Sequence, residues 1–169
     1  MKEILHRLPM RFKFALVLVL PLIALGWFAA SGAIARQAAV NELSRMQALT
    51  ALAQQAGGWV HQVQRERGMT AGFLGSQGKV FGDRLRQQRS DTDAAAEAFF
   101  QQRDQLDATL LTSTISSQLA AVEQQWQQNQ SLRDQVDLLS VATPEALGHY
   151  TGLNSLLMVL VGELAHLTG

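Results

Sequence analysis

The fold class follows from residues 49–74, which read LTALAQQAGGWVHQVQRERGMTAGFL. Apolar or small side chains recur there every three or four residues, the spacing that places them on one face of an α-helix. The members of this stripe are Leu49, Ala53, Ala56, Val60, Val63, Thr70 and Leu74. The pattern predicts an amphipathic helix from residue 36 to about residue 74 that packs its apolar face against other helices.

The same spacing continues through the rest of the chain. It predicts two further helices at about residues 79–111 and 115–140, and a fourth that begins within residues 142–145 and carries an apolar row as far as Leu167. The connections are a turn at Gly75-Ser76-Gln77-Gly78, a break and cap at Thr112-Ser113-Thr114, and a helix start at Ala142-Thr143-Pro144-Glu145. Short connections favour antiparallel neighbours. The sequence therefore predicts an all-α protein, in which an N-terminal transmembrane helix continues into an up-down antiparallel bundle of about four helices.

Residues 14–35 form an uncharged segment between Lys13 and Arg36. Its 22 residues are enough for an α-helix to cross the hydrocarbon core of a bilayer, which takes about 20. Four basic residues and one acid precede this segment: Lys2, Arg7, Arg11, Lys13 and Glu3. By the positive-inside rule, residues 1–13 are cytoplasmic and residues 36–169 form a periplasmic helical domain. We therefore expect a single-pass protein of the inner membrane.

A cleaved signal peptide is the alternative explanation of this segment. Ala33-Ile34-Ala35 has the small-x-small form of a cleavage site. The apolar stretch is longer than the roughly 7–15 residues of a signal-peptide core, and helical periodicity continues past it, which favours an uncleaved anchor. Residues 36–169 are exported under either interpretation. An apolar helix leads directly to Gly169, so we expect the domain to be incomplete at its C-terminal end.

Composition argues against several classes of function. The formal net charge is zero, so nothing suggests a nucleic-acid partner. The chain has no cysteine, and its four histidines lack the spacing of metal ligands. No arrangement typical of a catalytic site is visible, so we expect neither an enzyme nor a cofactor or metal. The exported part carries 10 basic and 13 acidic residues, so any anion site depends on a local cation rather than on the overall field.

Arg67 is the strongest candidate for such a cation. Continuing the first stripe by its own spacing places position 67 between Val63 and Thr70, on the face that points into the bundle, whereas Arg65 and Glu66 fall outside it. A guanidinium buried without a partner costs several kcal/mol. Either an internal carboxylate pairs with it, or its side chain extends past the edge of the core, or it binds an anion through its planar fork. Thr70, one turn further, adds a hydroxyl donor to the third interpretation.

Arg89 on the second helix is a weaker candidate for anion binding. It shares a row with Leu85 and Thr92, but Asp93 is its i+4 neighbour, and a local Arg89–Asp93 pair is the favoured explanation. Arg103 is adjacent to Asp104 and is expected at the surface. His149 and Tyr150 are expected to have packing and capping roles.

Three segments resemble motifs of the nitrate- and nitrite-sensing domains of bacterial chemoreceptors, sensor kinases and an antiterminator regulator. Gln64-Arg65-Glu66-Arg67-Gly68-Met69-Thr70 resembles the Q-x-E-R-G-hydrophobic-S/T segment of that family. Gln88-Arg89-Ser90-Asp91-Thr92-Asp93 is similar to its Q-R-x-x-T-D, and Tyr150-Thr151-Gly152-Leu153-Asn154 to its Y-x-x-(apolar)-N. The three motifs occur in the family's order across residues 45 to 168.

The resemblance implies an all-helical sensor whose anion-binding arginine is Arg67, with nitrate, nitrite or a similar small oxyanion as ligand. It also implies a longer domain, in which a second ligand arginine comes from a later helix or from a partner subunit. Two functions are compatible with the residues: a membrane-anchored anion sensor of chemotaxis or two-component type, which we expect to form a homodimer, or a ligand-free helical stalk that dimerises. The position of Arg67, facing a polar pocket or an internal carboxylate, distinguishes them.

Overall fold

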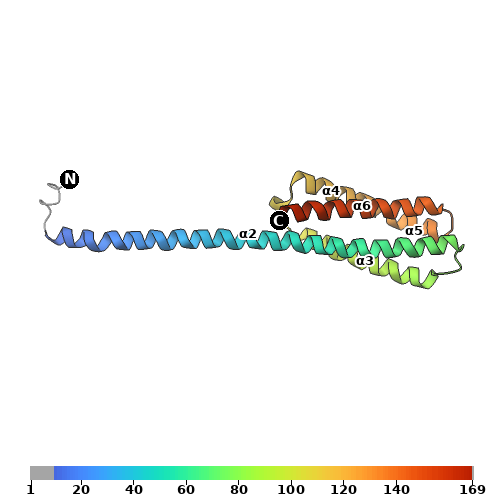
Figure 1. Cartoon of the computed structure of the whole chain (residues 1–169), viewed down its shortest axis with the longest axis horizontal. Helices are drawn as coiled ribbons and strands as arrows, with labels where there is room; N and C mark the ends of the chain where they lie inside the picture. The colour runs from blue at the N-terminus through green and yellow to red at the C-terminus, as the bar shows by residue number, and fades with distance from the viewer. Residues whose placement is uncertain (1–9, 169) are drawn as a thin grey trace. The chain divides into compact units, whose positions relative to one another are not determined.

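The computed structural model describes residues 10–168, and this range is almost entirely helical (Figure 1). The elements are α2 (Met10–Gly75), α3 (Gly82–Asp104), the 3-10 helix η1 (Ala108–Leu110), α4 (Ser113–Gln127), α5 (Asn129–Asp137) and α6 (Thr143–Thr168). No strand occurs between residues 10 and 168. The predicted all-α class is therefore confirmed.

The chain divides into two compact units, Met1–Ser44 and Arg45–Gly169, and α2 contributes residues to both. In the first unit, the large apolar side chains of α2 from Leu18 to Leu43 are exposed. By length and composition, this part of α2 can cross a membrane, and it is the one candidate span in the described chain. Lys2 and Arg7, part of the predicted cytoplasmic N-terminus, lie outside the described residues.

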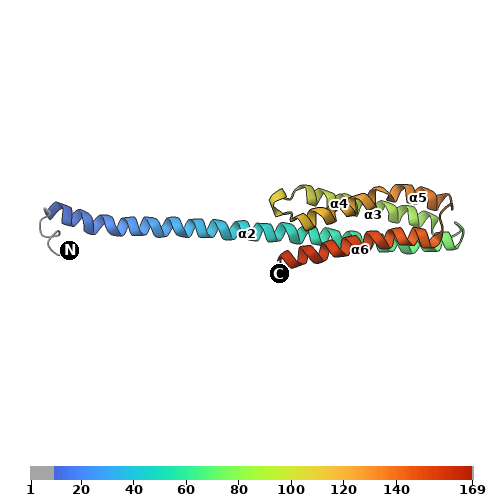
Figure 2. The same ribbon diagram turned by 90° about the horizontal axis from the view of Figure 1, so that it is seen from above.

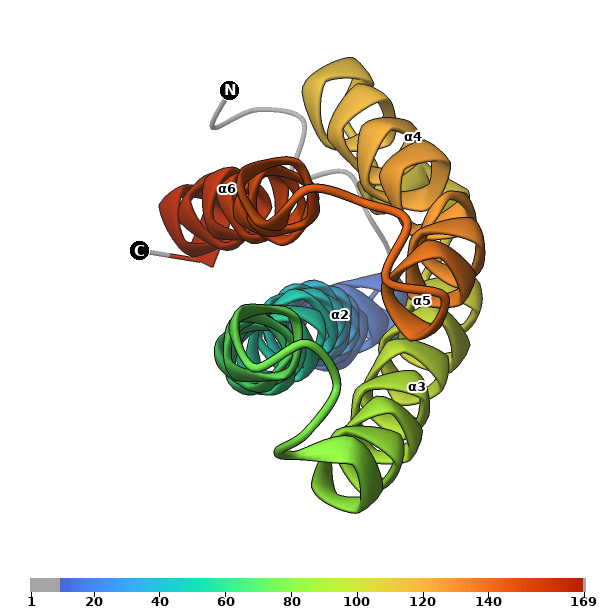
Figure 3. The ribbon, with the colours of Figure 1, turned by 90° about the vertical axis from the view of Figure 1, so that its right-hand side faces the viewer.

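The second unit is an up-down bundle. Its helices run in alternating directions, with α4 and α5 following one another along one side (Figures 1 and 2). Viewed end on, α2 lies between α3 and α6 (Figure 3). This is the predicted arrangement of about four helices, with α4 and α5 together occupying one position.

An aromatic cluster joins α2 to its neighbours in the core. The Trp59 ring lies 5.2 Å from Phe99 and 5.5 Å from Phe100, both on α3, and 5.0 Å from Trp126 on α4, measured between ring centroids. Trp59 and Phe99 are fully buried. Such tilted and edge-on ring pairs stabilise a core beyond the area that they bury.

The helix ends follow local side-chain chemistry in two places. The Thr112 hydroxyl accepts a hydrogen bond from the backbone N–H of Ile115 at 3.2 Å, so the predicted cap is confirmed. The predicted end of the second helix at 111 is wrong, because α3 stops at Asp104. There the Asp107 carboxylate accepts the Thr109 N–H at 2.9 Å, a local bond that competes with helix continuation and lowers the pKa of Asp107.

The sequence indicates the turn after α2 but not the break between α4 and α5. Gln77 and Gly78 have φ of 54° and 79°, so the predicted turn at 75–78 is confirmed, with glycine at a left-handed position. The predicted third helix over 115–140 is instead interrupted after Gln127 and ends at Asp137. No glycine or proline marks that interruption.

Candidate functional site

The buried seam of α2 determines which charged side chain enters the core. Its steps alternate between three and four residues, through Leu49, Leu52, Ala56, Trp59, Val63, Glu66 and Thr70. Glu66 is therefore a core residue with 0% exposure, and Arg67 is exposed. The prediction that Arg67 faces the core and Glu66 faces solvent is wrong, whereas Arg65 is exposed as expected.

The prediction of the buried face of α2 is wrong because it did not weigh the size of the residues in the stripe. The prediction centred the stripe on Ala53 and Val60, but the larger Leu52 and Trp59, one position earlier in each case, are both fully buried. A shift of one residue turns a helix face by about 100°. Val60 is also buried, at the edge of the seam. The sequence is therefore compatible with either of two apolar stripes that lie one residue apart.

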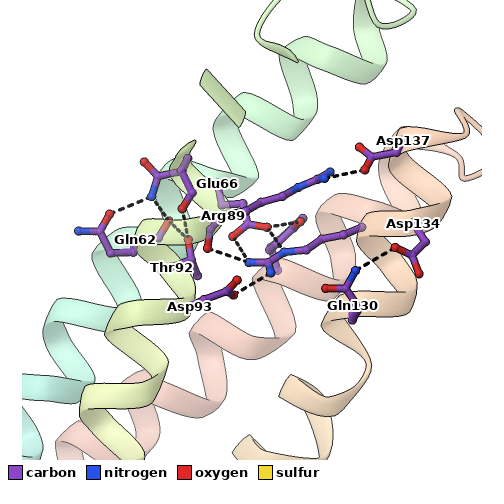
Figure 4. A network of polar contacts seen from close by, with 11 residues as sticks. Gln62, Glu66, Arg89, Thr92, Asp93, Gln130, Asp134 and Asp137 are labelled. Carbon is purple, nitrogen blue, oxygen red and sulfur yellow. Dashed lines mark hydrogen bonds and ion pairs between the residues drawn. The ribbon is translucent and has the colours of Figure 1, made fainter. Parts of the chain in front are cut away.

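Arg133 on α5 neutralises the buried Glu66 carboxylate. Glu66 and Asp93 lie in one network of polar contacts (Figure 4). Arg133 donates from Nε to Oε1 of Glu66 at 2.8 Å and from Nη2 to Oε2 at 2.9 Å, the two-pronged geometry in which guanidinium binds carboxylate best. Its Nη1 donates to Oδ1 of Asp93 on α3 at 2.7 Å. On α6, the Tyr150 hydroxyl donates to Oε1 of Glu66 at 2.9 Å. Every helix position of the bundle thus contributes to one cluster.

The electrostatics of this cluster keep Arg133 positively charged and the Tyr150 hydroxyl protonated. Burial acts to lower the pKa of Arg133, but its hydrogen bonds and charge attraction to Glu66, and then to Asp93, outweigh burial and raise it. Burial and the Glu66 charge raise the pKa of Tyr150, so its hydroxyl remains a donor across the physiological range.

Arg89 forms a long-range ion pair rather than the predicted local one. Its Nη1 lies 2.8 Å from Oδ2 of Asp137, and its side chain is only 11% exposed. The favoured Arg89–Asp93 pair is wrong, because Asp93 bonds Arg133 instead. The Nε and Nη2 atoms of Arg89 are buried without a hydrogen-bond partner. Arg103, expected at the surface, is partly buried and pairs with Glu123 as well as with Asp104.

Arg67 lies in a polar groove of about 520 Å³ between α2 and α6. The groove is lined by Gln64, Arg67, Thr151, Asn154, Ser155 and Met158. None of these residues is acidic, and within residues 10–168 Arg67 has neither a hydrogen bond nor an ion pair. The Oδ1 atom of Asn154 is buried there without a hydrogen-bond partner. The groove thus presents an unneutralised guanidinium beside neutral polar side chains.

Two further grooves have the opposite electrostatic character. The larger, of about 640 Å³ between α3 and the α4–α5 pair, includes Asp93, Glu97 and Asp104 among its lining residues. Arg133 lines it too, but that guanidinium is already paired with Glu66 and Asp93. The other, of about 500 Å³ between α5 and α6, includes Glu145. Carboxylates in these two grooves disfavour an anion, whereas the Arg67 groove has none.

The other two predicted site residues lie outside the Arg67 groove. Thr70 is fully buried in the seam of α2, and Arg89 is held by Asp137. The structure therefore does not bring Arg67, Thr70 and Arg89 together around one cavity. Their roles in anion binding remain predictions.

Sequence reasoning missed Glu66, Arg133 and Tyr150 as members of one polar cluster. A spacing signal existed for two of them. Arg133 continues the row Ile115, Leu119, Val122, Trp126 and Asn129 by steps of three or four, and Tyr150 continues the row of Ala146, Leu153 and Leu157. A charged or hydroxyl-bearing residue in a core row predicts a buried polar partner on a facing helix.

A family model for nitrate and nitrite sensing matches residues 59–169, which is most of the bundle. The chain belongs to the nitrate and nitrite sensing family. The match includes Arg67, Arg89 and the Tyr150–Asn154 segment, so the resemblance seen in the motifs is confirmed.

A solved structure of the NasR transcription antiterminator is similar to this nitrate and nitrite sensing chain. The two share 25% sequence identity with a TM-score of 0.72, over 86% of this chain and 38% of the antiterminator chain. The present chain therefore spans well under half the length of that protein. A comparison with curated protein sequences gives no match.

Proposed function

We propose that this chain is the sensor part of a membrane-anchored receptor that binds nitrate, nitrite or a similar small oxyanion at Arg67. The observation that carries the proposal is the unpaired Arg67 guanidinium in a groove without carboxylates, in a member of the nitrate and nitrite sensing family. Four other arginines already form ion pairs with carboxylates of the chain: Arg86, Arg89, Arg103 and Arg133. Arg67 is free to bind an anion from solution.

The chemistry of the groove suits a planar oxyanion. A guanidinium offers two parallel N–H donors that match two oxygens of nitrate, and the Asn154 amide lies in the same groove. The Thr151 hydroxyl donates to the Leu147 carbonyl at 2.7 Å and the Ser155 hydroxyl to the Thr151 carbonyl at 2.9 Å. These hydroxyls must rotate before they can donate to a ligand. The primary donors are therefore the Arg67 guanidinium and the Nδ2 group of Asn154, since Oδ1 of Asn154 is an acceptor.

Arg67 by itself supplies only part of the binding free energy. Hydrogen bonds to charged groups contribute roughly 1.5–3 kcal/mol each, whereas micromolar affinity requires about 8 kcal/mol. We expect a second cation to supply the remainder, most simply from a partner subunit of a homodimer that packs along α2. Arg89 and Thr70 are weaker candidates, because Asp137 already binds the first and the second is buried in the seam.

Calorimetric titration of the full chain in detergent micelles or lipid nanodiscs tests the anion site. We expect heat from nitrate or nitrite and none from chloride. Arg67→Ala should abolish that heat, and the matched control Arg65→Ala should retain it, because Arg65 is exposed and lies outside the groove. If no oxyanion binds, the chain is a ligand-free helical stalk rather than a sensor. If Arg67→Ala binds nitrate as the wild type does, the anion site lies elsewhere and the assignment to Arg67 is wrong.

The membrane anchor and the orientation belong to the same proposal. The exposed apolar part of α2 supports a membrane span. The basic residues that precede it support the orientation with the bundle in the periplasm. We propose that the span stays uncleaved and that the bundle feeds a chemotaxis or two-component pathway. Cell fractionation and N-terminal sequencing check this. A mature protein that begins near Arg36 in the soluble periplasmic fraction contradicts the anchor. Sedimentation of the full chain in detergent checks the homodimer. A chain that sediments as a monomer both with and without nitrate contradicts it.

A further inference from the structure

We propose that the hydrogen bond from Tyr150 to Glu66 is the positioning contact of the Arg67 groove, the contact that sets how far α6 lies from α2. The inference rests on the proposed anion-binding function, because that groove is the site it positions. It assigns a role to Tyr150, which sequence reasoning treated as a packing residue.

Each end of this hydrogen bond is adjacent in sequence to the groove. Glu66 directly precedes Arg67 on α2, and Tyr150 directly precedes Thr151 and lies about one helical turn before Asn154 on α6. The Tyr150 hydroxyl lies 2.9 Å from Oε1 of Glu66. Because this bond joins the two helices that form the groove walls, a change in the bond moves the groove donors relative to one another.

The acceptor end is fixed by a third helix. Arg133 on α5 bonds both oxygens of Glu66, and Asp93 on α3 holds Arg133 in turn. The Glu66 carboxylate therefore cannot turn away without breaking bonds to a buried guanidinium. Tyr150 consequently anchors α6 to a rigid group and not to a mobile surface side chain.

The donor end is equally constrained. The Tyr150 side chain is 1% exposed, and its ring packs edge-on against His149 with the ring centroids 5.8 Å apart. A ligand that needs donors from two helices binds most tightly when those donors are already spaced correctly. The Tyr150–Glu66 bond provides that pre-organisation for Arg67 on one wall and Asn154 on the other.

Tyr150→Phe is the variant that isolates this role. It keeps the ring in the core and leaves Glu66 satisfied by Arg133, so the bundle remains folded. Thr92→Val is the matched control. It also removes one hydroxyl from a fully buried side chain. That hydroxyl donates to the Gln88 carbonyl at 2.9 Å and lies 3.5 Å from the Gln62 carbonyl, so it joins α3 to α2 and does not touch α6.

Two measurements on the full chain follow. The chain has no cysteine, so spin labels at Gln64→Cys and Ser155→Cys report only the separation across the groove. These labels are measured without nitrate, because they occupy groove positions. Calorimetry of the unlabelled variants then gives the nitrate affinity. We expect Tyr150→Phe to broaden or shift the label distance and to weaken nitrate binding by roughly tenfold, with Thr92→Val unchanged in both.

The outcomes separate the two proposals. If Tyr150→Phe has the label distance and the nitrate affinity of Thr92→Val, Tyr150 only packs and the inference is overturned. If the wild-type chain does not bind nitrate, the proposed function fails, and the label distance still decides the positioning role. A changed distance in Tyr150→Phe then supports the contact between α2 and α6, and an unchanged one overturns it.

Discussion

The guanidinium of Arg133 bonds both carboxylate oxygens of Glu66, at 2.8 and 2.9 Å, although 67 residues separate them in the sequence. The two side chains are 5% and 0% exposed, so solvent does not screen the pair. A buried pair of this kind adds little net stability, because desolvation offsets the attraction, yet losing one partner is costly. Its effect is therefore to fix how α5 and α2 are rotated against one another.

Removing the carboxylate alone should destabilise the bundle strongly. In Glu66→Leu, Arg133 keeps only the partly exposed Asp93 as an acidic partner and stays largely buried. We expect a loss of about 3–5 kcal/mol in the free energy of unfolding. Urea unfolding followed by circular dichroism measures it, and a loss below about 1 kcal/mol would show that the guanidinium can reach solvent.

Removing the three buried polar members together should reverse that loss, because Asp93 is 52% exposed and can remain charged. The triple variant Glu66→Leu, Arg133→Met and Tyr150→Phe leaves no unpaired buried charge and fills a similar volume. Such replacements are often neutral or stabilising by about 1–4 kcal/mol, so we expect wild-type stability or better. Unfolding under the same conditions checks this, and a triple variant as unstable as Glu66→Leu would contradict it.

At Arg67 the shape of the cation should matter as much as its charge. Arg67→Lys keeps the positive charge but loses the planar fork, so it should impair nitrate binding nearly as much as Arg67→Ala. Because Arg67 has no ion pair within residues 10–168, neither variant should lower the melting temperature appreciably. Calorimetry and thermal melts of the three proteins test this, and wild-type nitrate affinity in Arg67→Lys would exclude a two-pronged contact.

The single tyrosine should resist ionisation for as long as the bundle is folded. Burial and the Glu66 charge raise the pKa of Tyr150 above the ordinary value of about 10. A raised folded-state pKa means that the contribution to stability is present below pH 10 or so and is lost at higher pH. We expect tyrosinate absorbance to appear only together with the loss of helical signal. Half-ionisation near pH 10 in the folded protein would contradict this, and Tyr150→Phe is the blank.

His149 should make stability depend on pH in the opposite direction. Burial lowers its pKa, with Glu66 partly opposing, while Nδ1 lies 3.0 Å from Nε2 of Gln125. The unfolded chain binds a proton near pH 6.5 that the folded chain does not, so this stability is present above about pH 6.5 and is lost as pH falls through the lowered pKa. Urea unfolding between about pH 7.5 and pH 5 should show a steeper fall for the wild type than for His149→Gln. Parallel curves would contradict it.

The sequence by itself determined the helices and most of their ends. Apolar side chains at steps of three and four residues are a local property, and so are the glycine at the turn after α2 and the Thr112 cap. The end of α3 was missed because the Asp107 side chain competes locally with the helix. The interruption after Gln127 was missed because no helix-breaking residue accompanies it.

Tertiary structure alone decided which face of α2 is buried and which charges meet. Ala53 with Val60, and Leu52 with Trp59, define two stripes one residue apart, and only packing against Phe99 and Trp126 favours the second. That choice turns Glu66 inward and Arg67 toward α6. The partners of Glu66 lie 67 and 84 residues away, and local periodicity carries no information about which charge on a distant helix reaches the same depth in the core.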